Sequence, residues 1–328
     1  MKNHRRITLL LVAFVVMLGL AACAEQRQEQ EADIKKELQV TVGYLPMVSS
    51  LTHFVALDQG FYEAEGLQVE ALRINTSNLL AEHVVIGDID AAIELAVVPL
   101  LDQLVSRPGN ALIFSTSIIT AENGFDGVLA KPGSNINNLE DLSGMKVGVF
   151  PGTTAEATLE ALFEQLYPGL ELPVSVQINP ADQLQALADG DIDALFAYEP
   201  ELTEGMVKYG FEEISTSLYA LQYDESPIGV GAVNSDWARN NPDAAHRFYA
   251  AIDRAVFFIR QKPLQARKIL ADATGIDEDV AAMMNIMPMS LTSEIYLNNL
   301  EGYIEILFEM GEIISKPFAR EICIPQAK

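Results

Sequence analysis

The sequence predicts an α/β protein made of two lobes that share one plan. Short β-rich runs alternate with helical patterns from Leu38 to about residue 200, an order that is typical of sheets wrapped by helices. The run Gly-Asp-Ile-Asp-Ala occurs at residues 87–91 and again at residues 190–194, each time between a helical pattern and an apolar run. Two copies in matching contexts indicate two lobes of similar construction.

Residues 1–22 predict a secretory signal peptide. A basic start precedes an apolar run over residues 7–20, which as a helix would rise about 21 Å and is too short for a bilayer core of about 30 Å. The end of the segment, Leu20-Ala21-Ala22-Cys23, resembles a bacterial lipobox, which implies that Cys23 carries lipid and begins the mature chain. An ordinary signal peptide with a chance cysteine is the alternative.

The mature chain is predicted to begin with a tether and to continue as an acidic globular body. Residues 23–37 are rich in Glu, Gln and Lys and contain no aromatic residue, as is typical of segments that form no core. The chain has 46 acidic and 21 basic residues, a net charge of -25, which argues against binding to nucleic acid. If Cys23 is lipidated, Cys323 has no partner for a disulfide.

The expected elements follow from local patterns. Residues 154–166 place four large apolar residues on one helix face. After about residue 235 the strand-like runs stop, and helices are expected over residues 236–261, from Pro263 onward and over residues 292–314. The strand candidates are Leu38–Tyr44, Leu67–Arg73, Ile89–Ile93, Ala111–Ile118, Met145–Phe150, Val174–Ile178 and Ile192–Ala197.

Several of these segments together resemble one protein family. Residues 43–46 and 54–67 look like the opening of the periplasmic-binding family of importers for nitrate, taurine, sulfonates and thiamine precursors, and residues 87–92 are similar to its next landmark. The start of the second lobe of that family is similar to residues 138–155. The landmark that closes its sheet is similar to residues 190–200, with Tyr198-Glu199-Pro200 at the end.

The resemblance implies a type II-like periplasmic binding protein, with parallel-rich sheets flanked by helices and a ligand cleft between the lobes. It implies that residues 38–125 and 230–328 form lobe 1 and that residues 126–229 form lobe 2. The crossovers are then expected near residues 123–128 and 226–231, where small residues tolerate hinge motion. The implied partners are an importer permease and its ATPase, and the implied location is the extracytoplasmic side of the cell membrane, with a monomer held by its lipid.

Candidate ligand-binding residues follow from a rule for open α/β sheets, in which ligands bind beyond the carboxyl ends of the strands. Glu94 is the most informative, because it interrupts an apolar run and a buried carboxylate needs a partner. Helix capping is the alternative for the hydroxyl residues. The positions are Tyr44, Ser49, Ser50, Thr76, Ser77, Asn78, Glu94, Thr153, Thr154, Tyr198 and Glu199.

The predicted role is capture of a small molecule for import. Phosphate-loop, nucleophile-elbow and complete dinucleotide motifs are missing from the sequence, and the histidines lack metal-ligand spacing, so no enzyme activity, cofactor or metal is expected. The candidate positions include no Lys or Arg, which favours a polar heterocycle, such as a thiamine-precursor pyrimidine or a flavin-like vitamin. A small anion (sulfonate, taurine, nitrate or bicarbonate) and a lipid-anchored enzyme on the same fold are the alternatives.

Overall fold

The computed structural model describes residues 38–151, 154–287 and 289–326. The predicted signal peptide, the lipidation site Cys23, the tether and the candidate residue Thr153 lie outside this range. Within the described residues, none of the helices has the length and apolar character needed to cross a bilayer.

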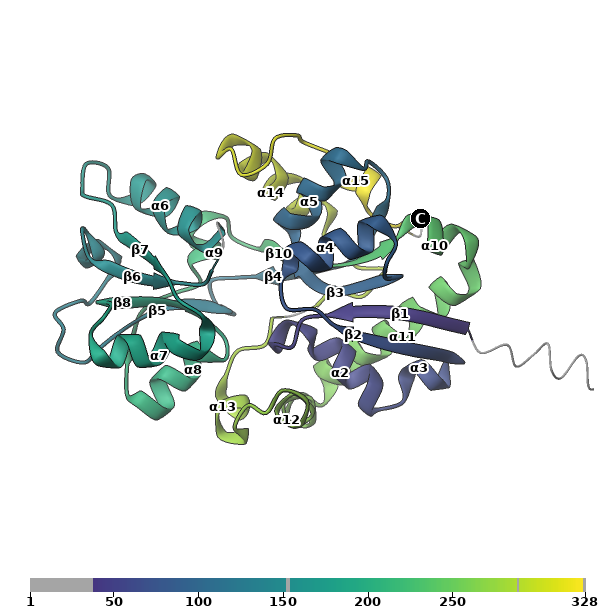
Figure 1. The fold of residues 1–328 in the computed structure, drawn as a ribbon, viewed down its shortest axis with the longest axis horizontal. Coiled ribbons are helices and arrows are strands. Elements are labelled where there is room, and N and C mark those ends of the chain that lie inside the picture. Colours follow the sequence, from purple (N-terminus) through teal and green to yellow (C-terminus); the bar gives the residue numbers. More distant parts are fainter. Residues whose placement is uncertain (1–37, 152–153, 288, 327–328) are drawn as a thin grey trace, which may run out of the picture. The chain divides into compact units, whose positions relative to one another are not determined.

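The first sheet has five strands in the order β2-β1-β3-β10-β4 (Figure 1). Strands β1 and β3 are parallel, whereas β10 is antiparallel to both of its neighbours. The sheet is therefore mixed, because β10, which lies between β3 and β4, comes late in the chain and runs antiparallel to both. The strands are β1 (Leu38–Tyr44), β2 (Leu67–Arg73), β3 (Ala91–Ala96), β4 (Ala111–Ile119) and β10 (Ser226–Asn234).

The second sheet also has five strands, in the order β7-β6-β8-β5-β9. Strand β6 is parallel to β7 and β8, and β5 is antiparallel to β8 and β9. Both sheets thus have a parallel core and an antiparallel strand from elsewhere in the sequence. The strands are β5 (Asp126–Ala130), β6 (Lys146–Val149), β7 (Val174–Gln177), β8 (Ala194–Tyr198) and β9 (Glu212–Thr216).

Helices flank both sheets. The helices associated with the N-terminal half are η1 (Val48–Ser50), α2 (Leu51–Asp58), α3 (Phe61–Ala64), α4 (Ser77–Ile86), α5 (Val97–Ser106) and η2 (Leu139–Leu142). Those in the middle of the chain are α6 (Thr154–Leu166), α7 (Pro180–Asp189), α8 (Glu201–Glu204), η3 (Gly205–Tyr209) and α9 (Leu218–Gln222). The C-terminal helices are α10 (Ser235–Asn240), α11 (Pro242–Gln261), α12 (Pro263–Thr274), α13 (Glu278–Met283), α14 (Leu297–Glu309) and α15 (Ala319–Ile322).

The repeated Gly-Asp-Ile-Asp-Ala run has the same structural role in both sheets. Gly87 and Gly190 end α4 and α7 in the left-handed conformation, at φ 86° and 83°. The second aspartate of each copy then holds the neighbouring strand. Asp90 Oδ2 accepts a hydrogen bond from the Thr41 amide, and Asp193 Oδ2 accepts one from the Lys146 amide, each at 2.8 Å. The repeat therefore fixes the start of a buried strand against its parallel partner in each sheet.

Three strands were not expected from the sequence. Both predicted crossover segments, residues 123–128 and 226–231, run into strands, at the start of β5 and in β10 respectively. The third unexpected strand, β9, is largely polar and lies at the edge of its sheet. The long helix expected over residues 236–261 is divided at Asn241, because Pro242 begins a new helix.

The core of the first sheet is aromatic on the side of α11. The Phe248 side chain is fully buried, stacks on Tyr62 with 6.0 Å between ring centroids and meets the Phe114 ring edge-on at 5.5 Å. Helix α11 is thus held on the first sheet by packing, which fixes the position of its C-terminal end.

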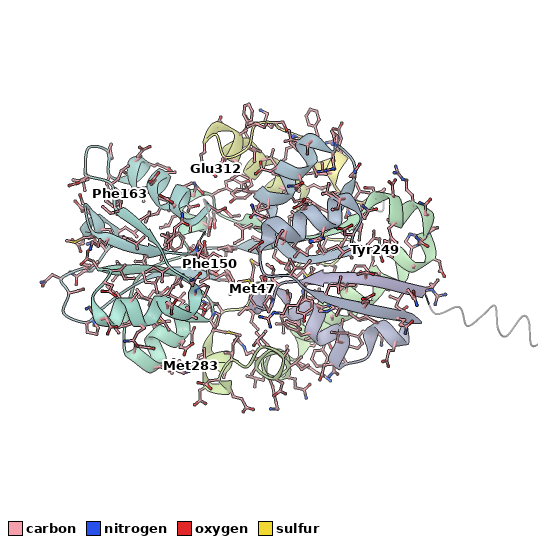
Figure 2. The ribbon with its side chains drawn as sticks, viewed as in Figure 1. Met47, Phe150, Phe163, Tyr249, Met283 and Glu312 are labelled. Atoms are coloured by element: carbon pink, nitrogen blue, oxygen red, sulfur yellow. The ribbon has the colours of Figure 1, made fainter. Side chains whose placement is uncertain are left out.

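Side chains on two other helices differ in burial. Phe163 on α6 is buried, and Met283 at the end of α13 is 66% exposed. Both side chains are labelled in Figure 2.

Candidate functional site

A pocket of about 240 Å³ lies where η1, β3, β4, α11 and α12 converge. All of its lining residues fall in segments 48–52, 94–123 and 256–289, so the predicted lobe 2 contributes none of them. They are Val48, Ser49, Leu51, Thr52, Glu94, Ser117, Asn123, Val256, Ile259, Arg260, Pro263, Arg267, Ile286, Met287 and Met289. Two of the sequence-predicted residues, Ser49 and Glu94, are brought together here.

Glu94 has an unusual backbone conformation. The pairing of β3 with β10 is interrupted by a bulge, in which Ile93 and Glu94 lie opposite the single residue Gly231. Glu94 takes a left-handed φ of 49°, which is uncommon for a residue with a side chain and is found most often at functional sites. The bulge interrupts the regular alternation of the strand and turns the carboxylate of Glu94 toward the pocket.

The Glu94 carboxylate is buried without a protein partner. The residue is 3% exposed, and no hydrogen bond of ordinary geometry reaches either carboxylate oxygen from the described residues. Burial raises the pKa of Glu94 to about 7, and the nearby Ser117 hydroxyl opposes this rise only in part. The Oγ atoms of Ser117 and Ser49 also lack a partner among the described residues. Since buried polar groups are normally hydrogen-bonded, this cluster is suited to contact a ligand.

Two arginines line the same pocket, whereas the candidate positions drawn from the sequence include no basic residue. Arg260 is near the end of α11, and its Nη2 donates to the Met289 carbonyl and to Glu294, at 3.1 and 3.0 Å. Arg267 is on α12, and its Nη1 donates to the carbonyls of Ala281, at 2.9 Å, and of Met284. These bonds hold each guanidinium in place and leave further N–H groups for a ligand.

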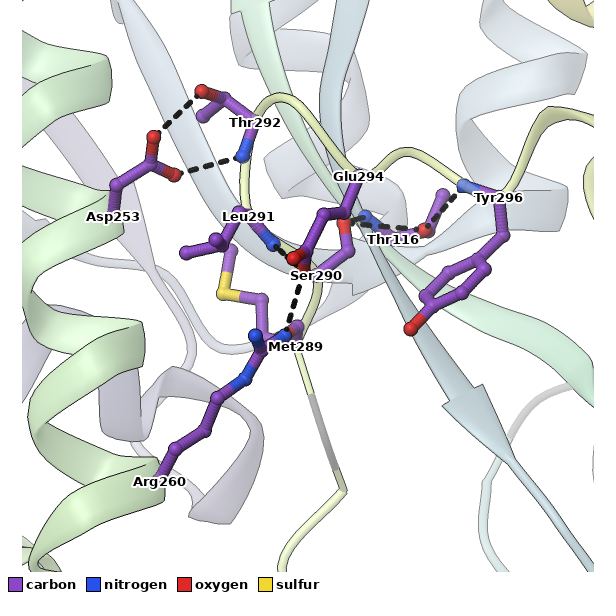
Figure 3. A network of polar contacts seen from close by, with 9 residues as sticks. All are labelled: Thr116, Asp253, Arg260, Met289, Ser290, Leu291, Thr292, Glu294 and Tyr296. Carbon is purple, nitrogen blue, oxygen red and sulfur yellow. Dashed lines mark hydrogen bonds and ion pairs between the residues drawn. The ribbon is translucent and has the colours of Figure 1, made fainter.

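A network of polar contacts fixes the segment that carries Met289 (Figure 3). The Asp253 carboxylate accepts hydrogen bonds from the amide and hydroxyl of Thr292 at 2.7 and 2.9 Å. On the other side of the segment, Ser290 Oγ accepts from the Thr116 amide at 3.0 Å. The segment is therefore tied to α11 and to β4 at once, which positions the wall of the pocket.

The other sequence-predicted residues of the first sheet lie outside the lining of the pocket. The Tyr44 ring stacks on His53, with 4.9 Å between centroids. Ser50 is fully buried. Thr76 caps α4 by accepting a hydrogen bond from the Leu79 amide at 3.3 Å, Ser77 Oγ accepts from the Ala96 amide at 3.2 Å, and Asn78 is exposed.

Three further predicted residues lie in β8, directly after it, or at the start of α6. Thr154 begins α6 and is half-buried. The Tyr198 hydroxyl is 2.8 Å from the hydroxyl of Tyr219. Glu199 is buried, and its Oε1 accepts hydrogen bonds from the Thr203 hydroxyl and the Asn285 amide, both at 2.9 Å. The carboxylate of Glu199 thus holds the backbone next to two residues of the pocket wall.

Sequence reasoning missed most of the residues that line the pocket. Arg260 and Arg267 lie on helices rather than in loops after strands, and Pro263 was expected only to start a helix. No local signal marks the arginines, because they lie on two successive helices and only the packing of α11 and α12 places them beside Glu94.

Comparisons with known proteins agree with this fold. A family model described as NMT1/THI5 like matches residues 49–266. A protein of Bacillus subtilis (strain 168) that is named for binding aliphatic sulfonates is 23% identical over 301 residues, which are 86% of this chain and 83% of that protein.

Solved structures of the same fold include binding proteins and an enzyme. The periplasmic aliphatic sulphonate binding protein of Escherichia coli matches with a TM-score of 0.71 at 16% identity, covering 87% of this chain and 97% of that one. The periplasmic nitrate-binding protein of Synechocystis PCC 6803 matches with a TM-score of 0.66 at 15% identity, over 88% and 85% of the two chains. A desulfurization enzyme matches with a TM-score of 0.65 at 17% identity, over 88% and 96%.

The predicted fold and family are confirmed by these matches. Two mixed sheets with flanking helices form a type II periplasmic-binding fold. The sequence resemblance to the periplasmic-binding family of importers is also supported by the relatives named for sulfonates and nitrate. Because the family model covers well over half of the sequence, the chain belongs to the NMT1/THI5-like family.

Proposed function

We propose that this chain is the solute-binding component of an ATP-driven importer and that its ligand is a small organic acid of the sulfonate type. The observation that carries the ligand class is the presence of Arg260 and Arg267 in one pocket. Guanidinium groups bind oxyanions through charge-assisted, often paired hydrogen bonds. This reading replaces the polar heterocycle expected from the loop residues and adopts the small-anion alternative.

The similar proteins support the same choice. The relatives named for sulfonates and nitrate favour the same class of ligand.

An enzyme on this fold is the second candidate, because a desulfurization enzyme shares it. Covalent catalysis would need an activated nucleophile in the pocket. None of the described lining residues is a cysteine or a histidine. Ligand capture is therefore the better-supported function.

The further parts of the proposal concern place and partners. We propose that Cys23 carries the lipid that holds the protein on the extracytoplasmic side of the membrane, beside a permease and its ATPase, and that residues 38–125 with 230–328 and residues 126–229 move as two lobes. Labelling with palmitate would test the anchor. Label that persists in Cys23→Ala would contradict it.

Calorimetry against short-chain sulfonates, nitrate, a hydroxymethylpyrimidine and riboflavin tests the ligand class. The sulfonates should bind, and Arg267→Gln should weaken their binding by about tenfold or more, since about 1.4 kcal/mol corresponds to tenfold. Arg239→Gln is the matched control, because its side chain is 72% exposed and pairs with Asp236 away from the pocket lining. Binding of only the pyrimidine or riboflavin would contradict the proposal.

A further inference from the structure

Two links carry the chain between the sheets, and they are bonded to each other. The first link, residues 120–125, joins β4 to β5, and the second, residues 217–225, joins β9 to β10 and contains α9. Ser217 Oγ donates to the Thr120 carbonyl at 2.9 Å, and the Ser217 amide donates to the Asp126 carbonyl at 2.8 Å. These contacts form a junction between the links, and a movement of one sheet relative to the other would have to bend both links.

The backbones approach each other closely at this junction. Ser217 takes a left-handed φ of 52°, which is uncommon for a residue with a side chain. A Cβ atom added to Gly124 would overlap the Ser217 hydroxyl and would lie 2.7 Å from the Thr216 hydroxyl. The two links are therefore as close as a glycine allows, so the junction depends on a few specific contacts.

Asp126, at the end of the first link, is the acidic group of the junction. Its side chain is fully buried, and its Oδ2 accepts a hydrogen bond at 2.6 Å from the amide of Leu218, the first residue of α9. Its Oδ1 has no hydrogen-bond partner among the described residues. Asp126 thus joins the first link to the helix of the second, but an ionised carboxylate is costly to bury without a cation or a full set of donors.

The surroundings of Asp126 supply acids and hydroxyl groups but no positive charge. The segment from the end of β8 through α8, which packs on β5, carries the acids Glu199, Glu201 and Glu204. None of β5, β8, α8, β9, α9, α14 or the two links contains Lys, Arg or His. The titratable groups that act on Asp126 from β8, β9, α9 and α14 are Tyr198, Glu213, Tyr219 and Tyr303.

This environment places the titration of Asp126 near neutral pH. Burial raises the pKa of Asp126 to about 7, the amide donors at the start of α9 oppose this rise in part, and the charge of Glu213 adds to it. A carboxyl whose pKa is raised in the folded state contributes stability at low pH, and this stability is lost as the pH rises through the folded pKa. The junction should therefore be firm below pH 7 and weaker above it.

We propose that Asp126 makes the junction a pH-sensitive hinge, in which the neutral carboxyl holds α9 on the first link and the ionised carboxylate loosens it. Loosening lets water reach the charged oxygens and frees both links to bend. Only the consequence for transport rests on the proposed function: a loosened hinge would favour movement of the two proposed lobes and release of ligand. The change at the junction itself requires neither a ligand nor a partner.

Hydrogen exchange of the ligand-free protein tests the junction directly. Protection of the amides of residues 217–225 is measured at pH 5.5, 7 and 8.5, after correction for the intrinsic pH dependence of exchange. In the wild type, protection should fall by about tenfold or more from pH 5.5 to 8.5, because each pH unit above the folded pKa changes the opening equilibrium by up to about tenfold. Asp126→Asn cannot ionise and should show no such fall. Asp224→Asn, which changes an exposed acid of the same link, should behave as the wild type.

The outcomes decide the proposal without reference to ligand binding. Protection that is independent of pH in the wild type, or that falls equally in Asp126→Asn, would overturn it, whether or not a sulfonate binds. Should Asp126→Asn not fold, Glu213→Gln is measured instead. That variant keeps Asp126 but removes a neighbouring negative charge, so the pH at which α9 loses protection should fall. A midpoint that stays in place or rises would also overturn the proposal.

Discussion

The buried Glu94 carboxylate should make the protein less stable as the pH rises, and Glu94→Gln should remove this effect. Burial raises the pKa of Glu94 from 4.5 to about 7 in the folded protein. A group whose pKa is raised on folding contributes stability that is present below the unfolded pKa and is lost as the pH rises through the folded pKa. At about 1.4 kcal/mol per pH unit, the full difference amounts to about 3 kcal/mol.

The accessible pH range should reveal about two thirds of this effect. At pH 5.5 the folded carboxyl is still mostly protonated, and at pH 8.5 it is ionised, so linkage gives about 2 kcal/mol of lost stability between the two. Glutamine cannot ionise, and its other effects on stability are the same at both values. The basic residues that share the pocket, Arg260 and Arg267, are present in both proteins. Asp126, whose pKa is also raised to about 7, is present in both proteins and cancels.

Urea unfolding of ligand-free wild type and Glu94→Gln at pH 5.5, 7 and 8.5 measures this difference. We expect the free energy of unfolding of the variant, minus that of the wild type, to rise by about 2 kcal/mol across the series. Glu82→Gln, which changes an exposed acid, should show a constant difference. A difference for Glu94→Gln that stays flat or falls with pH would refute the argument that this carboxylate is buried and unpaired.

Two further predictions concern Gly229 and Phe248. Gly229→Ala should weaken binding of a short-chain sulfonate by about tenfold or more, since the added Cβ would lie 2.8 Å from Oε2 of Glu94, which lines the pocket; calorimetry that finds unchanged affinity would contradict this. Phe248→Ala should lower the free energy of unfolding by roughly 3–5 kcal/mol, because the ring is fully buried between Tyr62 and Phe114. A loss below about 1 kcal/mol in urea would show that the ring is not well packed.

Local patterns predicted the parts of the fold that depend on neighbours in the chain. The strands Leu38–Tyr44 and Leu67–Arg73 and the helix Thr154–Leu166 were predicted with their observed bounds, because periodicity and turn residues act over a few positions. The repeat was informative for the same reason. In both copies a glycine ends the helix and an aspartate bonds the neighbouring strand, so one local requirement recurs in two sheets.

The parts that depend on distant pairing could not be predicted in this way. Strand β10 lies between β3 and β4, although more than 100 residues separate it from either. Its glycines read as hinge residues in the sequence, yet they are needed where Glu94 and Phe114 approach the strand closely. Glu94 itself could be found, because a charge in an apolar run is a local anomaly. Arg260 and Arg267 could not, since only packing of α11 and α12 places them beside it.

The wall of the pocket shows how a residue outside the lining can still belong to the site. Arg267 binds the carbonyls of Ala281 and Met284, and Glu199 accepts the Asn285 amide at 2.9 Å. Between these anchors and Met289, Ile286 and Met287 line the pocket. Glu199 directly follows β8 of the second sheet, so the wall of a pocket built on the first sheet is held in part from beside the second. Ligand contact by Glu199 stays a prediction, whereas its hydrogen bonds place it behind the wall. A carboxylate there couples the position of β8 to the shape of the pocket, because moving Glu199 away would leave the Asn285 amide without its acceptor.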